Sequence, residues 1–388
     1  MLFRSVPRPY PPDLRLLTGL RAFAALLVVL FHFSARTAQN SVLHTTLIDR
    51  GQLGVDVFFV LSGFILAHVY LARIKAGRFA HDEFLVARFA RLYPMHLVMT
   101  GLAILMGVWG MYRGAVPLGV YGYLIGVDPG TGGGAGWNFI TSLGLVQAWG
   151  TTNGHYFNAV SWSISAEAFA YMLFPAIAAV ALMFGDKAWL RLIAALAFYS
   201  CCEAGSQVLL GCGLNDLSWR FGILRILPEF TLGVALYGLG AQKTMPRRGL
   251  MILMPVTLIA VIAALTFGAP LAVMPPLFGL CILMLANAER AKLTPPEWLL
   301  GPLVYLGEIS YSTYMLHLLL GQIYFNAMAR LFHQDPHDLS VWQVAMAVAL
   351  MVAASSATYH FVERPGRELL RRTSRRQAIR PVRLAAAA

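Results

Sequence analysis

Charged side chains are scarce in this chain of 388 residues. Asp, Glu, Lys and Arg make up 12% of it and hydrophobic residues 58%, whereas a soluble globular domain carries about 25% charged residues. So little charge cannot cover a globular surface of this size with polar groups. The composition therefore excludes a soluble enzyme, a disordered protein and a secreted disulfide scaffold.

Cysteine is scarce too, and its spacing excludes two kinds of site. The four cysteines lie in apolar stretches and form no Cys-x-x-Cys pair, so neither a zinc site nor a redox motif is expected. They are Cys201, Cys202, Cys212 and Cys281. We expect no bound metal and no resident cofactor.

Long apolar runs are what the chain has in place of charge. They are about 20 residues long, the length with which a helix crosses the hydrocarbon core of a bilayer. We predict an all-α membrane protein with about ten transmembrane helices, in one membrane domain over residues 10–365. The predicted spans are 15–34, 54–73, 92–112, 162–184, 188–211, 221–240, 249–267, 270–288, 303–329 and 341–362.

The stretch between the third and fourth spans is predicted to stay outside the bilayer core. Its apolar runs, 116–127 and 138–149, are too short to cross and flank the glycine-rich TGGGAGW at 131–137. We therefore expect the whole of 113–161 to form one outer loop.

The distribution of Lys and Arg predicts the orientation. Apart from Arg21 and Arg225, which lie inside spans, 23 of the 28 basic residues fall on one side of the predicted bilayer, and such residues concentrate in cytoplasmic segments. Both termini are therefore expected in the cytoplasm, with a basic tail, 366–388, along anionic headgroups. This accounts for most of the net charge of +12 without nucleic-acid binding.

Polar groups at membrane depth are functional candidates, because burying them is costly. Arg21 and His32 lie 11 residues apart on the first span, on the same side and about 16 Å from each other. Asp56 and Glu167 enter from the outer side on two other spans, at the depth of His32. A carboxylate bound to one ring nitrogen of His32 would let the other nitrogen act as a base. A buried structural pair is the competing interpretation.

Three further groups are candidates of the same kind. Arg88 and Arg91 lie one turn apart at the inner face and could grip a phosphate, or simply anchor the span. His317 lies in mid-span and is as compatible with a structural hydrogen bond as with catalysis. Glu308 lies near the inner end of the same predicted span and could pair with an inner arginine.

Taken together, these residues lie in motifs that resemble the acyltransferase-3 family of integral membrane acyltransferases. Six motifs occur in order over about 350 residues, while 187–300 carries none. They are TGLRAFAALLVVLFHF, GQLGVDVFFVLSGFIL, the Arg-x-x-Arg of Arg88 and Arg91, SWSISAEAFAYMLFP, ISYSTYMLHLLL and HFVERP. Some members carry a C-terminal esterase-like module, and this chain resembles the stand-alone form.

The resemblance implies O-acylation of an extracytoplasmic acceptor, usually a sugar hydroxyl, in the bacterial inner membrane. Cytoplasmic acyl-CoA, expected to be acetyl-CoA, is the implied donor. His32 matches the family's essential histidine and Arg21 its partner, while Asp56, Glu167 and the arginine pair occupy other motif positions.

Donors to the developing oxyanion are also needed, and Ser161, Trp162 and Ser163 are candidates by their position near Glu167. Two interpretations from other classes stay open at this point. One is a permease or exporter that uses the buried charges as a proton relay, and the other is a lipid-flipping or polymer-export partner without chemistry. The acceptor, the acyl chain length and the oligomeric state are left open.

The predicted orientation is tested with reporter fusions. A phosphatase fused to the C-terminus should be inactive, because it stays in the cytoplasm, whereas the same reporter inserted in the 113–161 loop should be active. An active C-terminal phosphatase would reverse the orientation.

Overall fold

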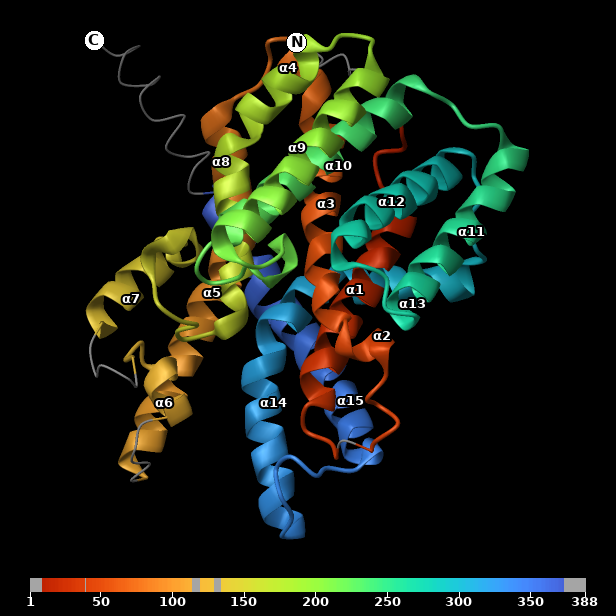
Figure 1. Ribbon diagram of the computed structural model, residues 1–388. Coiled ribbons are helices and arrows are strands. Elements are labelled where there is room, and N and C mark those ends of the chain that lie inside the picture. Colours follow the sequence, from red (N-terminus) through yellow and green to blue (C-terminus); the bar gives the residue numbers. More distant parts are fainter. Residues whose placement is uncertain (1–8, 39, 114–118, 129–133, 373–388) are drawn as a thin grey trace, which may run out of the picture.

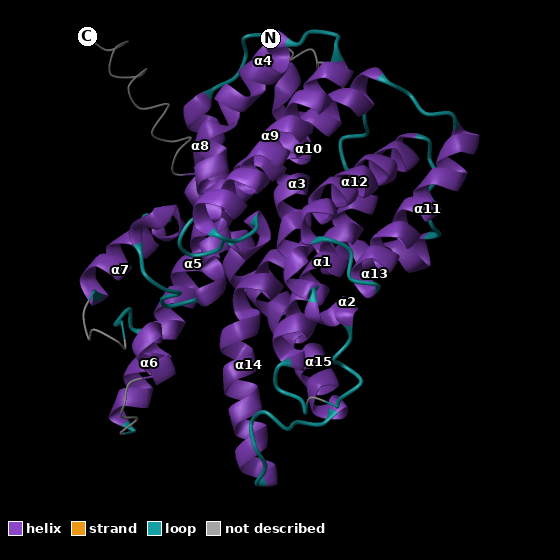
Figure 2. Ribbon diagram, in the orientation of Figure 1, coloured by secondary structure: helices purple, strands orange, loops and turns teal. Residues whose placement is uncertain are grey.

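The computed structural model describes residues 9–38, 40–113, 119–128 and 134–372. These residues form helices and connecting loops without a strand, apart from one isolated bridge between Thr37 and Leu339 (Figures 1 and 2). The α-helices are α1 (Arg15–Ser34), α2 (Thr46–Asp49), α3 (Gly54–Leu66), α4 (Ala72–Lys75), α5 (His81–Tyr112), α6 (Gly119–Leu124), α7 (Ala135–Leu143), α8 (Trp162–Met183), α9 (Ala188–Leu210), α10 (Gly222–Gln242), α11 (Arg247–Thr266), α12 (Met274–Arg290), α13 (Glu297–Glu308), α14 (Ser310–Phe332) and α15 (Val341–Thr358). Short 3-10 and π segments are η1 (Gly51–Leu53), η2 (Ala67–Leu71), η3 (Gln147–Thr151), η4 (Ala159–Ser161), η5 (Leu214–Asp216), η6 (Leu271–Val273) and η7 (Tyr359–Glu363).

The described part of the chain has nine helical stretches that are long and apolar enough to cross a membrane. They are 15–34, 51–75, 81–112, 159–183, 188–210, 222–242, 247–266, 271–290 and 341–372. This confirms the predicted all-α, multi-pass membrane protein. The third stretch begins eleven residues earlier than predicted, because α5 continues back through the polar segment that carries Arg88 and Arg91.

The predicted span 303–329 is divided, which the uninterrupted apolar run did not indicate. α13 ends at Glu308 and α14 begins at Ser310. Just before the break, Gly307 lies against the carbonyl oxygen of Thr18 on α1, where a Cβ atom would clash. α14 has 23 residues and could also cross a bilayer by length, at about 1.5 Å per residue, but it is more polar than the nine.

Glycine residues allow α3 and α10 to pack closely at the centre of the bundle. A Cβ at Gly63 of α3 would clash with the carbonyl oxygen of Phe230, and one at Gly233 of α10 would clash with that of Val60. Small residues let helix backbones approach in this way, and close packing drives helix association in lipid. α3 and α10 are thereby held together at the level of the site.

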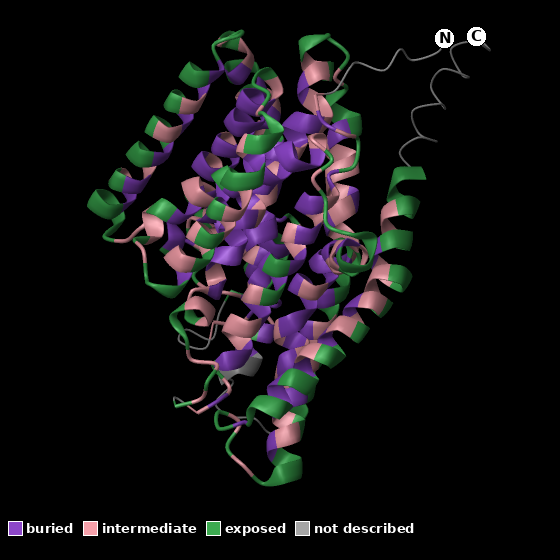
Figure 3. Cartoon of the chain, turned by 90° about the vertical axis from the view of Figure 1, so that its right-hand side faces the viewer, coloured by how far each residue is buried: buried purple, intermediate pink, exposed green. Residues whose placement is uncertain are grey.

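Burial separates the core helices from those at the periphery. In their apolar windows, 78% of the residues of α10 are buried in the protein but only 17% of those of α11. The outer face of α11 exposes Met251, Ile252, Ile259 and Ile262, and exposed surface alternates with buried surface along such helices in Figure 3. An exposed apolar face of this length fits contact with lipid chains.

The segment expected to form one outer loop contains short helices. α6, α7, η3 and η4 lie in 113–161, and α6 and α7 project beside α5 in Figure 1. The glycines of 131–137 fall partly outside the described residues. Of the predicted tail, residues up to Arg372 continue the last helix, and the rest lies outside the described part.

Candidate active site

Most of the predicted site residues line two cavities and a narrow passage between the helices. The first, here called the arginine cavity, has a volume of about 450 Å³ and is bounded by α1, α3, α5, α8 and α13. The charged residues that line it are Asp13, Arg15, Arg21, Arg88, Arg91, Glu167 and Glu308. The fold thus brings Arg21 to the Arg88 and Arg91 pair, so that cations from two helices face one space.

Glu167 belongs to the arginine cavity. Its Oε1 atom accepts hydrogen bonds from Ser62 Oγ at 3.0 Å and from Tyr171 OH at 2.5 Å. The prediction that this carboxylate could orient His32 is therefore wrong. The two residues were expected in one layer, but Glu167 contacts Ser62, six residues further along α3 than Asp56, and shares its cavity with Arg21, whose positive charge it partly balances.

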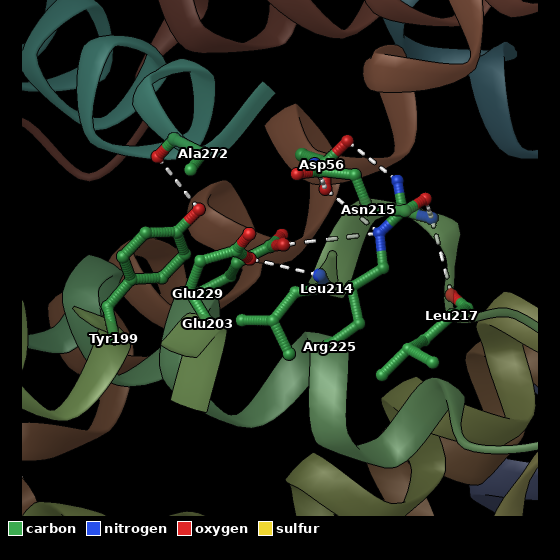
Figure 4. A network of polar contacts seen from close by, with 9 residues as sticks. All are labelled: Asp56, Tyr199, Glu203, Leu214, Asn215, Leu217, Arg225, Glu229 and Ala272. Atoms are coloured by element: carbon green, nitrogen blue, oxygen red, sulfur yellow. Dashed lines mark hydrogen bonds and ion pairs between the residues drawn. The ribbon is translucent and has the colours of Figure 1, made fainter. Parts of the chain in front are cut away.

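Asp56 forms a buried ion pair with Arg225, whose Nε also lies 4.0 Å from Oε1 of the equally buried Glu229. The carboxylate of Asp56 accepts from Arg225 Nε at 2.9 Å and Nη2 at 2.7 Å, and from Asn215 Nδ2 at 3.0 Å (Figure 4). Both side chains of the pair are almost fully enclosed. Asp56 is therefore also not the carboxylate that holds His32, and that prediction is wrong as well. Arg225, which interrupts a predicted span, is its partner on α10.

The Asp56–Arg225 pair also fixes a loop beside the site. Arg225 Nη1 donates to the carbonyl oxygens of Asn215 at 2.8 Å and Leu217 at 3.4 Å, as Figure 4 shows. Two residues later, Trp219 lines the second cavity. The pair thus connects α3 and α10 to the wall of that cavity.

His32 is paired with another histidine. His317 Nε2 lies 3.2 Å from His32 Nδ1, which is also 2.9 Å from the carbonyl oxygen of Val28. His317 Nδ1 lies 2.6 Å from the carbonyl oxygen of Tyr314. A carbonyl oxygen only accepts hydrogen bonds, so both neutral rings carry their proton on Nδ1.

The tautomer of His32 has a chemical consequence. Its Nδ1–H is shared between Val28 and His317, and its Nε2 keeps a lone pair that has no hydrogen-bond partner among the described residues. A histidine held by one nitrogen with the other free is arranged to act as a base. His317, completely buried on α14, does the orienting that a carboxylate was expected to do.

The free nitrogen belongs to a residue that lines the second cavity, here called the histidine cavity. Its volume is about 480 Å³, and its wall combines α1, α14 and the loops around 153–159 and Trp219. His155 lines it as well, and burial lowers the pKa of this imidazole to about 4, so the ring is neutral at physiological pH. The neutral His155 ring can form a hydrogen bond to a hydroxyl group in this cavity, and with so low a pKa it does not compete with His32 for the proton of that hydroxyl.

A small space of about 60 Å³, here called the passage, adjoins the arginine cavity. It shares Arg21, Phe58, Arg91 and Glu167 with that cavity, and Tyr314 lies in its wall. The rings of Phe58 and Tyr314 have centroids 6.4 Å apart. Because the carbonyl of Tyr314 holds His317, one residue separates the passage from the histidine pair.

The other predicted residues divide between the passage and the surroundings. Ser163 lines the passage and donates to Tyr314 OH at 2.8 Å. Ser161 accepts from Gln147 at 3.2 Å, through both its carbonyl and hydroxyl oxygens, and lines neither cavity. Glu308 is exposed at the edge of the arginine cavity. Among the residues that the structure describes, no cluster of His, Cys, Asp or Glu could hold a metal ion.

Comparisons with known proteins indicate the family of the chain. The family model of the acyltransferase domain matches residues 15–360. The acyltransferase MdmB of Streptomyces mycarofaciens is 29% identical over 92% of each chain. Protein 2 in the picA locus of Rhizobium radiobacter is 41% identical over 24% of this chain and 45% of its own. The peptidoglycan O-acetyltransferase OatA of Listeria monocytogenes is 30% identical over 26% of this chain and 14% of its own. No solved structure matches the chain significantly.

The Asp56–Arg225 pair is predicted to stabilise the fold. Asp56→Asn leaves a buried guanidinium without its bidentate partner, and breaking a buried pair in this way costs about 3–5 kcal/mol. Thermal unfolding in detergent should show a large decrease in midpoint. Asp82→Asn, at an exposed position at the start of α5, is the matched control. An unchanged midpoint for Asp56→Asn would show that the pair is dispensable.

Proposed function

This chain is a member of the acyltransferase family whose domain it matches, and on that premise we propose that it moves an acetyl group from acetyl-CoA to a glycan hydroxyl. The donor binds in the arginine cavity and the acceptor in the histidine cavity. The observation that supports this most is the free Nε2 of His32 in one cavity and the arginines in the other, with the passage adjoining the arginine cavity and Tyr314 between the passage and the histidine pair. Family membership sets aside the permease and export interpretations.

The donor side follows from charge. Coenzyme A carries phosphates, and guanidinium groups bind phosphate through charge-assisted, often bidentate hydrogen bonds. Arg88 and Arg91 lie one turn apart on α5 and line the cavity that opens beside the start of α1. The distribution of basic residues predicts that this end lies in the cytoplasm, where acyl-CoA is available.

The acyl group then has to reach the acceptor. We place the thioester in the passage, where Phe58 and Tyr314 confine it and Arg21 lies in the wall. The small volume favours a short acyl group such as acetyl. Ser163 and Tyr314 carry the hydroxyl groups in the wall that could donate to the developing oxyanion.

His32 supplies the base. As the acceptor oxygen attacks the thioester carbonyl carbon, Nε2 takes the hydroxyl proton, and the carbon–sulfur bond then breaks. The sulfur leaves as thiolate toward the arginines, whose positive charge stabilises it. When His32 is protonated, its Nδ1–H donates more strongly to His317 Nε2, which stabilises the imidazolium.

The acceptor is proposed from the family and from the cavity. OatA is named as a peptidoglycan O-acetyltransferase, and aromatic rings such as Trp219 and Tyr123 line the histidine cavity beside polar side chains such as Asn153. Rings with neighbouring amide groups suit the flat faces and hydroxyls of sugars. Because the described residues include nine helices that are long and apolar enough to cross a membrane, we place the enzyme in a bacterial plasma membrane.

The role of His32 is tested with a variant that keeps hydrogen bonding but cannot take a proton. His32→Gln should lower acetyl transfer by about 10²–10⁴ while acetyl-CoA binding is retained. His317→Gln should cause a smaller loss, because it removes the orientation of the base and not the base itself. His81→Gln, exposed at the start of α5, is the control. Near-normal turnover by His32→Gln would make His32 structural.

The donor site is tested with a charge-matched pair of double variants. Arg88→Ala with Arg91→Ala should weaken acetyl-CoA binding, since each lost charged hydrogen bond costs about 1.5–3 kcal/mol. Arg73→Ala with Arg78→Ala removes the same charge from exposed positions nearby that do not line the cavity. The affinities of the two double variants for acyl-CoA are compared by titration. Equal affinities would show that Arg88 and Arg91 do not bind the donor and only anchor the helix at the membrane surface.

A further inference from the structure

The charge of the histidine cavity is one-sided. Arg36 is the one charged residue in its described lining, and it lies beside the neutral imidazoles of His32, His155 and His317. No Asp or Glu is found among the described residues that line it. The arginine cavity differs in this respect, because three acidic residues lie in its wall beside the arginines.

Arg36 is the permanent charge in this cavity, and its position is well defined. Its backbone N–H donates to Phe33 at 3.0 Å and its carbonyl oxygen accepts from Leu339 at 2.9 Å. Its Nη2 donates to Gln322 Oε1 at 2.8 Å, on α14. A guanidinium has five N–H donors, so most of them stay available to a ligand.

Arg36 forms no ion pair within the part of the chain that the structure describes. Two other arginines of the same half of the bundle are occupied. Arg225 is enclosed by its bond to Asp56, and Arg50 donates to the carbonyl oxygens of Ala264 and Ala269. Arg36 is the one among these three that faces a cavity without a counter-charge.

The apolar lining of the histidine cavity strengthens the interaction of Arg36 with a charged ligand. Apolar rings, among them Phe33, Phe157 and Phe325, line the same space, and charges interact more strongly where water is excluded. Arg36 lies two residues beyond Ser34, the last residue of α1, and lines the same cavity of about 480 Å³ as His32. A group bound to Arg36 would thus lie within one or two sugar units of a hydroxyl at His32 Nε2.

We propose that Arg36 selects an acceptor that carries a carboxylate or phosphate group on the acylated sugar or on its neighbour. This rests on the proposed function and specifies the substrate class of the same site. A guanidinium binds either oxyanion through two parallel hydrogen bonds. The hydrogen bond to Gln322 holds the Arg36 guanidinium in place. The acceptor is then recognised by its anionic group, and its hydroxyl is positioned at Nε2 of His32.

The experiment uses the natural acceptor in charged and neutralised forms. Surface glycan is isolated from a strain that lacks this gene. One portion is left intact, one is reduced with carbodiimide and borohydride so that carboxylates become alcohols, and one is dephosphorylated. Initial rates of acetyl transfer by the purified protein, at acceptor concentrations far below saturation, give kcat/KM for each portion.

The wild-type protein should prefer the intact glycan over one of the neutralised forms by about tenfold or more, as expected for a lost charged hydrogen bond. The form that loses activity identifies the anion. In Arg36→Gln the preference should fall to near one, and Arg36→Lys should keep part of it. Arg330→Gln, which removes a charge from an exposed position at the end of α14, should keep all of it.

Equal rates of the wild-type protein on all three portions would overturn the proposal, even if Arg36→Gln did not fold. So would an Arg36→Gln variant that retains the preference of the wild type. A wild-type protein that binds acetyl-CoA but modifies none of the portions would reject the proposed glycan acceptor itself, and this inference with it.

Discussion

Charge buried among apolar helices has to be balanced or given access to water, and the arrangement of this bundle follows from that constraint. The chain meets it in three ways. Arg225 of α10 lies between two buried carboxylates, Asp56 of α3 and Glu229 of α10, and balances their charge. The arginines on α1 and α5 face a cavity with Glu167, and the histidines on α1 and α14 are neutral and bind each other. Each solution involves helices that are distant in sequence.

Placing His32 and the arginines of the arginine cavity in different cavities favours the proposed chemistry. A base must be neutral before it takes a proton, and those arginines, if placed beside it, would add to the opposition that Arg36 already presents to the positive charge it acquires. In this fold α1 carries both functions, with Arg21 in one cavity and His32 in the other. A neutral partner such as His317 sets the tautomer of His32 without adding a charge to an apolar wall.

Sequence patterns predicted the bounds of the helices better than they predicted which helices and side chains contact each other. α1 has the predicted bounds because its apolar run is bordered by polar residues at both ends. The break at Ile309 was missed, since the composition is apolar on both sides of it and close backbone packing against Thr18 leaves no mark there. Arg21, Arg88 and Arg91 were each expected toward the inner side, and the three residues share one cavity.

The position of a residue along a span fixes neither its depth nor its lateral neighbours closely enough, and this explains the errors at the site. Asp56 and Glu167 lie in spans that enter from the same side as His32, yet each faces another partner. Arg225 interrupts an apolar run at the same end of its span as Asp56, a signal of opposite charges that could have identified the pair. His155 lies in a loop without a motif, so only the folded chain reveals that it lines a cavity.

The central claim is that donor and base meet through the passage. A structure of the protein with a non-hydrolysable acetyl-CoA analogue tests it most directly. The account predicts phosphates against Arg88 and Arg91 and the acetyl carbonyl in the passage, beside Phe58 and Tyr314 and directed toward His32. An analogue whose acetyl end points away from the passage, or whose phosphates bind in the histidine cavity, would contradict it.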